Sequence, residues 1–357
     1  MPNHRYGLIM AGGRGTRFWP RSRKKNAKQV LRFFGERTLI QQTVDRLNGV
    51  IPPENIWIIT NEALQSEIRK QLPEVPKQQI IAEPEQRNTA PCIALAAQIL
   101  VEQDPEAVIG VFPADHLIQK EAKFRNFVKA AFRAAETSSV VVLGIQPRWP
   151  ETGYGYIEFP RDVRPGSPDP LPVTSFREKP DERTAKRFFE RGNFYWNAGM
   201  FFWSASNVLE LMRHHQPKTA TLLAGLPAFR SKQFSSRLAE AYPLCENISV
   251  DYAIIEKTDA VKGIALDDIG WNDVGSWEAV YDLATKDANG NAATGTLVAE
   301  NSRGNYVDAK KIVALVGVEN LVIVDTADAL LVCSRSKAQD VSKLVKTLDA
   351  QRREELL

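Results

Sequence analysis

A basic, glycine-rich segment near the N-terminus contains the residues with the clearest chemical potential. After a short apolar run at 6–10, small and basic residues alternate in the order Gly12, Gly13, Arg14, Gly15, Thr16 and Arg17. Nine lysines and arginines, Lys28 among them, precede the first acidic residue, Glu36. Glycine lets a backbone approach a ligand closely, and basic side chains donate to phosphate oxygens. The segment therefore predicts a turn that binds a polyphosphate.

Two common phosphate-binding loops do not fit this turn. The dinucleotide fingerprint would place a glycine where Phe18 stands, and the chain contains no Gly-Lys pair of the kind a P-loop needs. An ordinary tight turn without a ligand is the alternative. Eight basic residues from Arg14 to Arg32 argue against it, because so many like charges repel one another unless an anion balances them.

Two aspartates stand at positions that suit a ligand site. Asp115 follows the apolar run 108–112, and the carboxyl end of a strand is where open α/β sheets bind ligands. Asp273 lies in the segment 270–277. Each of them has the alternative role of capping the helix that follows. They are far apart along the chain, and the sequence alone does not bring them together.

A third polar segment begins a helix after a strand and a loop. It reads Arg87-Asn88-Thr89-Ala90-Pro91, with the proline in the first helical turn. The free amides of that helix end, together with Asn88, are suited to face a nucleotide. A capped, buried helix without a ligand is the alternative.

The elements that position these residues alternate between strand and helix patterns over the first 150 residues. Strand-like runs lie at 56–60, 79–82, 108–112 and 140–145, and helix-like stretches at 38–47, 62–71, 89–101 and 124–136. This alternation predicts a Rossmann-like α/β domain with a largely parallel, mixed sheet covered on both faces.

Further strands and helices follow before the composition changes. We expect strands at 173–179, 195–203 and 261–266, a helix from about 181, and mostly helical structure over 205–257. Turn-forming residues at 286–295 then indicate a linker. We therefore predict one domain over 1–288 and a small β-rich domain with a terminal helix over 294–357. The even spacing of its short strands suggests a solenoid or stacked sheet.

The overall composition excludes several classes of protein. With 46 basic and 43 acidic residues the net charge is +3, which argues against a general nucleic-acid or membrane binder. Three separated cysteines without a paired motif favour a reducing cytoplasm. No apolar run reaches the roughly 18 residues of a membrane helix.

Taken together, the motifs resemble those of sugar nucleotidyltransferases. The segment 12–20, followed by Ser22-Arg23 and Lys28-Gln29, is most similar to the signature of the mannose-1-phosphate guanylyltransferases. Segments 87–91 and 270–277 strengthen the match. The chain departs from the family pattern at four side positions: Phe18, Arg21, Ala27 and Val30. These departures affect the shape of the loop more than its chemistry.

Three weaker segments resemble the sugar-binding side of that family. The loop 152–157, with Gly153 and Gly155, is similar to its hexose loop. The resemblance implies that Glu178 accepts from sugar hydroxyls, that Lys179 neutralises the sugar phosphate, and that Asn197 contacts a hydroxyl. Segment 249–257 also resembles the family, and we expect its role to be mainly structural.

The resemblance implies transfer of GMP from GTP to α-D-mannose 1-phosphate, which gives GDP-mannose and pyrophosphate. Arg17 and Lys28 would bind the triphosphate, while Asp115 and Asp273 would share one Mg²⁺ ion. The nucleotide would lie against Gly12, Gly13, Arg14, Gly15, Thr16, Arg87 and Asn88. We expect His116 to be structural.

Three alternatives to this function remain. One is a nucleotidyltransferase for another hexose 1-phosphate or base, such as glucose 1-phosphate with UTP, ATP or dTTP. Another is a non-catalytic subunit that senses a sugar nucleotide. A nicotinamide-dependent dehydrogenase is the weakest, because its fingerprint fails at Phe18. The terminal β runs and helix would either pair two subunits as a homodimer or lock against the catalytic domain.

Overall fold

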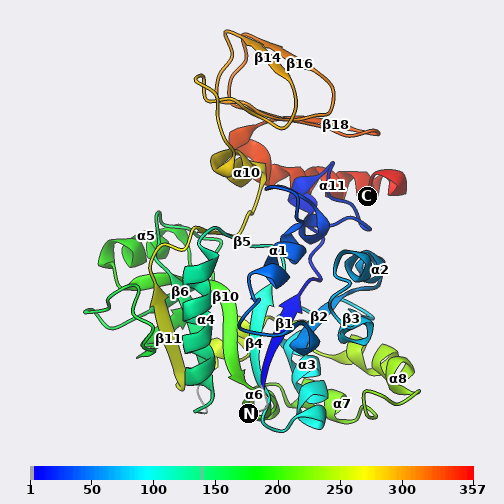
Figure 1. Ribbon diagram of the computed structural model, residues 1–357, viewed down its shortest axis with the longest axis vertical. Coiled ribbons are helices and arrows are strands. Elements are labelled where there is room, and N and C mark those ends of the chain that lie inside the picture. Colours follow the sequence, from blue (N-terminus) through cyan, green and yellow to red (C-terminus); the bar gives the residue numbers. More distant parts are fainter. Residues whose placement is uncertain (1–3, 138–139) are drawn as a thin grey trace.

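The computed structural model describes residues 4–137 and 140–357, and a ten-stranded mixed sheet forms its centre (Figure 1). The strand order is β3-β2-β1-β4-β10-β6-β11-β8; in addition, β7 pairs with β10, and β9 pairs with β7. The main strands are β1 (Arg5–Met10), β2 (Ile56–Asn61), β3 (Ile80–Glu83), β4 (Val108–Pro113), β6 (Val140–Ile145), β10 (Phe194–Ser204) and β11 (Val261–Leu266). The short ones are β7 (Tyr156–Glu158), β8 (Leu171–Pro172) and β9 (Ser175–Arg177).

Strand direction confirms the prediction of a largely parallel, mixed sheet. Strands β1, β2, β3 and β4 run parallel to one another, as connections through helices require. Strand β10 is antiparallel to both β4 and β6, and it carries a register shift between Asn197 and Phe201. The shift is a bulge that turns Asn197 within an otherwise buried, aromatic strand.

Helices cover both faces of this sheet because its strands are apolar on both sides. One face packs against α1 (Leu39–Asp45), α2 (Glu62–Gln71) and α4 (Glu121–Ala135). The other packs against α3 (Thr89–Gln103), α6 (Ala205–His215) and α8 (Phe234–Ala241). The connecting helices are α5 (Glu182–Arg191), α7 (Pro217–Ala224) and α9 (Val250–Ala253). A capping box at Thr38 begins α1, as its sequence predicts.

A second, two-stranded sheet lies beside the main one and was not predicted. Strand β5 (Leu117–Ile118) pairs antiparallel with β12 (Trp271–Asn272), so that Asn272 lies opposite Leu117. Asp115 precedes β5 and Asp273 follows β12. This short pairing therefore brings the two aspartates to one place. The strand expected at 173–179 is shorter than predicted, since β9 contains only Ser175–Arg177.

The C-terminal part forms a coil of short parallel strands at the top of Figure 1. Strands β13 (Ala292–Ala293), β15 (Tyr306–Asp308) and β17 (Leu321–Asp325) stack in parallel, and β14 (Leu297–Glu300) stacks on β16 (Val313–Val316). Strand β18 (Leu330–Ser334) pairs antiparallel with β17. Successive turns bury each other's apolar side chains, which agrees with the expected solenoid.

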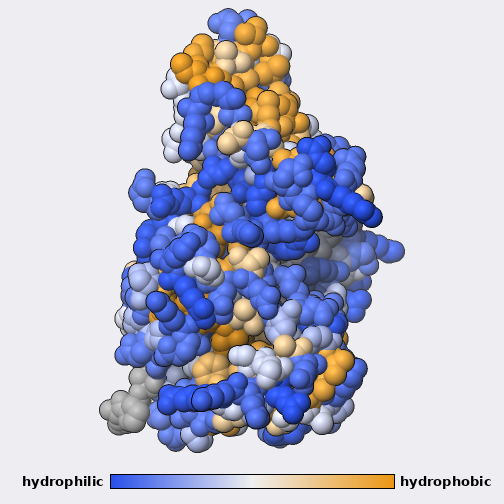
Figure 2. All heavy atoms as spheres, turned by 90° about the vertical axis from the view of Figure 1, so that its right-hand side faces the viewer, coloured by the Kyte–Doolittle hydropathy of each residue, from blue (hydrophilic) through white to orange (hydrophobic). Residues whose placement is uncertain are grey.

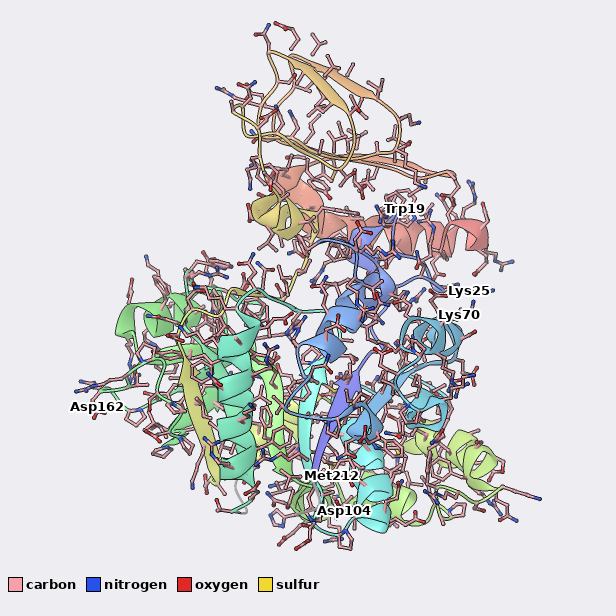
Figure 3. The ribbon with its side chains drawn as sticks, in the orientation of Figure 1. Trp19, Lys25, Lys70, Asp104, Asp162 and Met212 are labelled. Atoms are coloured by element: carbon pink, nitrogen blue, oxygen red, sulfur yellow. The ribbon has the colours of Figure 1, made fainter. Side chains whose placement is uncertain are left out.

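Helices α10 (Trp277–Leu283) and α11 (Val341–Ala350) join this coil to the signature segment. In Figure 3, Trp19 lies beside α11. The Trp19 indole donates to the carbonyl oxygen of Leu356 at 2.9 Å, and the Trp277 indole donates to the carbonyl oxygen of Trp19 at 3.2 Å. The C-terminal segment thus packs against the N-terminal domain, one of the two arrangements expected.

Several basic residues that follow the glycine-rich turn contact the C-terminal coil and the end of the chain. Three of them form ion pairs: Arg21 with Asp308 at 2.6 Å, Arg23 with Asp328 at 3.0 Å, and Lys24 with Glu354 at 2.5 Å. The argument that the whole basic run requires a bound anion was therefore too broad, because part of its charge is balanced within the protein. None of the helices within the described ranges has the length and apolar character of a membrane span.

Candidate active site

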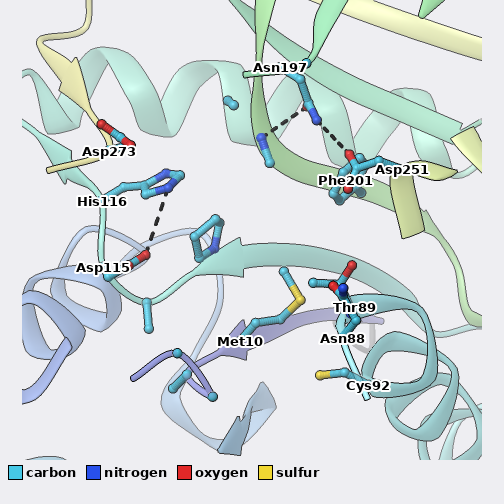
Figure 4. Close-up of a pocket in the computed structure, with 18 of the residues that line it drawn as sticks. Met10, Asn88, Thr89, Cys92, Asp115, His116, Asn197, Phe201, Asp251 and Asp273 are labelled. Carbon is cyan, nitrogen blue, oxygen red and sulfur yellow. Dashed lines mark hydrogen bonds and ion pairs between the residues drawn. The ribbon is translucent and has the colours of Figure 1, made fainter. Parts of the chain in front are cut away.

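Two adjoining cavities open at the carboxyl ends of the central strands. The larger has a volume of about 710 Å³ and the smaller about 350 Å³. Asp115, His116 and Asp273 line both of them. Figure 4 shows these three side chains at one end of the larger cavity, with Asn197 and Asp251 across from them. A ligand that spans both cavities would pass the two carboxylates.

Lys28 lies at the junction of the cavities and contacts both aspartates. It begins a short 3₁₀ turn, and its side chain is only 7% exposed. Nζ is 2.9 Å from Oδ2 of Asp115 and 2.6 Å from the backbone oxygen of Asp273. Burial would raise the pKa of Asp115, but the Lys28 ammonium outweighs burial and holds that pKa below its ordinary value. Asp115 is therefore an anion.

The capping alternatives for the two aspartates are wrong. Helix α4 begins after Lys120, and α10 begins after Ser276, so neither Asp115 nor Asp273 caps a helix. The Asp273 carboxylate instead accepts from the Tyr154 hydroxyl at 2.7 Å. Burial, with Asp273 as the second cause, raises the pKa of Tyr154, which keeps this hydroxyl a donor.

The donor set at the junction fits a hard divalent cation. Asp115 and Asp273 offer carboxylate oxygens, which Mg²⁺ prefers. In the described part of the chain no cluster of three or more histidine, cysteine or acidic side chains suits a metal. Two carboxylates would leave the remaining positions to phosphate oxygens and water, as is usual for Mg²⁺ at phosphate sites.

His116 lines both cavities, yet its contacts fit the expected structural role. Its Nδ1 lies 3.2 Å from the donating Trp271 indole nitrogen, and its carbonyl accepts from Arg46 at 2.9 Å. Burial lowers the pKa of His116 to about 4, so the ring is neutral near pH 7. The neutral His116 ring accepts from Trp271 of β12, which helps to hold β12 beside β5, and the ring adds no charge to the site.

The glycine turn is shaped by its contact with Lys28. Gly15 has φ +60°, and a Cβ there would lie 2.5 Å from Cβ of Lys28, so no other residue fits without a shift. The Gln29 side chain donates to the carbonyl oxygens of Ala11 at 2.7 Å and Gly13 at 3.0 Å. Gln29 thereby fixes the turn, a role that sequence reasoning did not assign.

The predicted nucleotide residues divide between the cavities. Gly12, Gly13 and Asn88 line the larger one, whereas Gly15, Thr16 and the predicted catalytic Arg17 line the smaller one. Arg14 and Arg87 line neither, and Arg87 pairs with Glu85 at 3.0 Å. Asn88 also caps α3 by accepting from the backbone N–H of Thr89 at 2.9 Å, which confirms the capping alternative, while its contact with a nucleotide stays a prediction.

Glu83 is a buried acid at the same end that sequence reasoning missed. It ends β3, lines the larger cavity and is 7% exposed. Its Oε1 accepts from the Tyr242 hydroxyl at 2.6 Å, and a Cβ on Gly12 would lie 3.4 Å from its Oε2. Burial raises the pKa of Glu83 to about 7, although Tyr242 opposes the shift. The sequence feature that could have identified Glu83 is its position as an acidic residue at the end of an apolar strand.

All five predicted sugar residues line the larger cavity: Gly153, Gly155, Glu178, Lys179 and Asn197. Lys179 pairs with Glu178 at 2.9 Å and has a left-handed backbone, with φ 44°. A Cβ on Gly155 would clash with Oε2 of Glu178, so a larger residue there would displace the Glu178 carboxylate from its present position. Asn197 donates to Asp251 at 2.9 Å. Asp251 lines the same cavity and was not predicted as a site residue.

Comparisons with known proteins agree with this arrangement. Residues 6–290 match the family described as nucleotidyl transferase, and residues 295–348 match the MannoseP isomerase/GMP-like beta-helix domain. The mannose-1-phosphate guanylyltransferase of Escherichia coli is 39% identical over 98% of this chain and 74% of the relative. The alginate biosynthesis protein AlgA of Pseudomonas aeruginosa is 38% identical over 98% of this chain and 73% of the relative.

A solved structure is similar over nearly the whole chain. It is described as a mannose-1-phosphate geranyltransferase from Thermus thermophilus and is 32% identical. The match covers 97% of this chain and 100% of that chain, with a TM-score of 0.86. The likeness therefore extends through both the central sheet and the C-terminal coil.

Proposed function

Because the chain belongs to the nucleotidyl transferase family, and within it to the mannose-1-phosphate guanylyltransferases, we propose that it makes GDP-mannose. The reaction transfers GMP from GTP to α-D-mannose 1-phosphate and releases pyrophosphate. One observation supports it above all. Lys28 contacts both Asp115 and Asp273 between a small cavity lined by Arg17 and a larger one with nucleotide and sugar residues.

The reaction depends on the alignment of the two substrates and on the stabilisation of phosphate charge more than on proton transfer. A phosphate oxygen of the sugar substrate attacks the α-phosphorus of GTP while pyrophosphate leaves on the opposite side. That oxygen is already anionic, so no side-chain base or nucleophile is needed. Arg17 and Lys28 stabilise the negative charge that spreads onto the transferred and leaving phosphates. The smaller cavity would hold the leaving pyrophosphate.

Asp115 and Asp273 are the residues that would hold a divalent cation, and we expect Mg²⁺. When bound, such an ion neutralises phosphate charge where the two substrates meet. Lys28 holds the pKa of Asp115 low, and the Tyr154 hydroxyl donates to Oδ1 of Asp273, which leaves Oδ2 for a cation.

Glu83 favours guanine as the base. The Watson–Crick edge of guanine carries two adjacent donors, on N1 and N2, and a carboxylate accepts from both. Adenine has an acceptor at N1, and uracil and thymine have one donor between two acceptors. Tyr242 donates to Oε1 of Glu83, which can still accept a second hydrogen bond, and Oε2 lies toward Gly12, which also lines the cavity. We infer that Glu83 reads the guanine edge from this position.

A substrate panel tests the proposal. The purified protein is incubated with Mg²⁺, one of GTP, UTP, ATP or dTTP, and the 1-phosphate of mannose, glucose or galactose, and pyrophosphate release is measured. We expect the highest kcat/KM with GTP and mannose 1-phosphate. A higher value for another pair would replace the substrate assignment, and inactivity with every pair would favour a sensing subunit.

The exposed side of the C-terminal coil suits contact with a second copy of the chain. Large apolar side chains are exposed there: Val298, Ile312, Val316, Leu330 and Val332. Figure 2 shows apolar atoms gathered over this end of the molecule. Apolar patches of this kind mark interfaces, so we propose a homodimer through the coil. Light scattering of wild type and Val316→Lys would test it.

All three cysteines are free, in keeping with the reducing cytoplasm we expect.

A further inference from the structure

The sugar end of the larger cavity contains a second carboxylate, Asp251, in a segment to which we assigned no site residue. Asp251 lines this cavity together with Glu178, Lys179 and Asn197. Its Oδ1 accepts from Nδ2 of Asn197 at 2.9 Å, and the only other hydrogen bond to this carboxylate within the described residues comes from the backbone N–H of Asp251 itself. In Figure 4 the two side chains face each other across this contact. One oxygen of Asp251 is therefore engaged and the other is available to a ligand.

We propose that Asp251 contacts the sugar directly, accepting a ring hydroxyl through Oδ2 while Oδ1 holds Asn197. This inference rests on the proposed function and names a specificity-determining residue for it. The segment that carries Asp251 was expected to be mainly structural, and this assignment changes that expectation for one of its residues.

The backbone around Asp251 is held in place from the nucleotide side of the cavity. Ser249 caps α9, and the N–H of Val250 donates to Oγ1 of Thr89 at 2.8 Å. The N–H of Ala90 donates in turn to the carbonyl oxygen of Ile248 at 3.2 Å. Asp251 thus stands on a turn fixed to the start of α3. A carboxylate on such a rigid support can select a hydroxyl by its position.

The charges around Asp251 favour a ligand rich in hydroxyl donors. Glu178 is a second carboxylate nearby, and Lys179 is the one described residue that forms an ion pair with it. Burial, followed by repulsion from Glu178, raises the pKa of Asp251 to about 7. Buried acceptors are costly unless donors satisfy them. Hexose hydroxyls supply such donors, whereas another anion would add to the repulsion, so the sugar ring is the occupant that fits.

The variant Asp251→Asn distinguishes two roles of Asp251: direct contact with the sugar, and acceptance of the hydrogen bond that holds Asn197 in place. Its amide oxygen still accepts from Asn197, but its NH₂ group cannot accept from a hydroxyl. We expect KM for mannose 1-phosphate to rise at least about tenfold, with KM for GTP within about twofold of wild type. Glu256→Gln is the matched control: Glu256 accepts from the N–H of Glu178 at 2.8 Å, and glutamine retains that acceptor.

Deoxy analogues identify the hydroxyl and can overturn the proposal. Mannose 1-phosphates lacking O2, O3, O4 or O6 are compared in wild type and Asp251→Asn. We expect one analogue to be discriminated against by wild type and no longer by the variant. Equal discrimination by both proteins against all four would reduce Asp251 to a positioning residue. Wild-type inactivity would instead refute the proposed function, and calorimetry with mannose 1-phosphate would then test Asp251 by binding alone.

Discussion

Lys28 and Asp115 form an ion pair at the point where the two cavities meet, with Nζ 2.9 Å from Oδ2, and the lysine is buried whereas the aspartate remains partly open to the cavities. A lysine expected to bind phosphate and an aspartate expected to bind a metal therefore already stabilise one another. The same ammonium contacts the backbone of Asp273 at 2.6 Å. If these groups act in the proposed reaction, their charges are already held in place by the protein, which would lower the cost of reorganisation during the reaction.

Replacing Lys28 by methionine should reduce kcat about a hundredfold, since the loss of one preorganised charge contact costs about 3 kcal/mol in the transition state. Pyrophosphate release at saturating substrates measures this effect. Lys25→Met, which removes an exposed charge from the same segment, should stay near wild type. An active Lys28→Met enzyme would show that the ion pair with Asp115 is only structural.

Asp273→Asn tests the metal assignment. The amide oxygen of asparagine still accepts from Tyr154, so the local fold should persist while the anionic ligand is lost. We expect kcat/KM to fall at least about a hundredfold and the apparent affinity for Mg²⁺ in the presence of GTP to weaken. Asp282→Asn, an exposed change in α10, is the control. Unchanged Mg²⁺ dependence in Asp273→Asn would remove Asp273 from the metal site.

The buried position of Glu83 predicts a conflict between stability and base selection. Its pKa is raised from 4.5 to about 7 in the folded protein, so stability falls as the pH rises through that window. Glu83→Gln should therefore increase the free energy of unfolding by about 3 kcal/mol at pH 8 and by less than about 1 kcal/mol at pH 5.

The same variant should lose part of its preference for GTP over ATP, because glutamine presents one acceptor in place of a carboxylate. Denaturant titrations at the two pH values and kcat/KM for both nucleotides measure these effects. Exposed Glu62→Gln should show neither change. If Glu83→Gln keeps full base selectivity, another group reads the base.

The central sheet could be predicted because its strands are continuous apolar runs and its helices have one apolar face. The run at 108–112, for example, is explained only by a strand buried on both sides. The coil at the C-terminus was also suggested by regular spacing. These features follow from local patterns that recur over many residues.

The convergence of the site could not be predicted from such patterns. Asp115 and Asp273 meet through a two-residue strand pair, β5 with β12, which is too short to show any periodicity. Glu83 and Asp251 are single acids whose burial depends on distant segments. The sequence also does not distinguish a basic residue that binds phosphate from one that forms an ion pair with another domain, as Arg21 does with Asp308.

That last ion pair leads to a prediction about the C-terminal coil. Arg21 follows the turn that carries Arg17, and Nη1 of Arg21 is 2.6 Å from Oδ2 of Asp308, whose side chain is 11% exposed. Among the described residues, Arg21→Met leaves the Asp308 carboxylate with the Thr294 hydroxyl, at 2.9 Å, as its remaining side-chain donor. We expect a loss of about 1 to 3 kcal/mol in the free energy of unfolding.

KM for GTP should also rise several-fold in Arg21→Met, because the turn with Arg17 would lose one of its anchors to the coil. Thermal unfolding and initial rates measure both effects, and exposed Arg32→Met serves as the control. A lower stability with an unchanged KM for GTP would show that the coil supports the fold without positioning the phosphate-binding turn. A change in both would mean that the C-terminal coil holds the nucleotide site in its active shape.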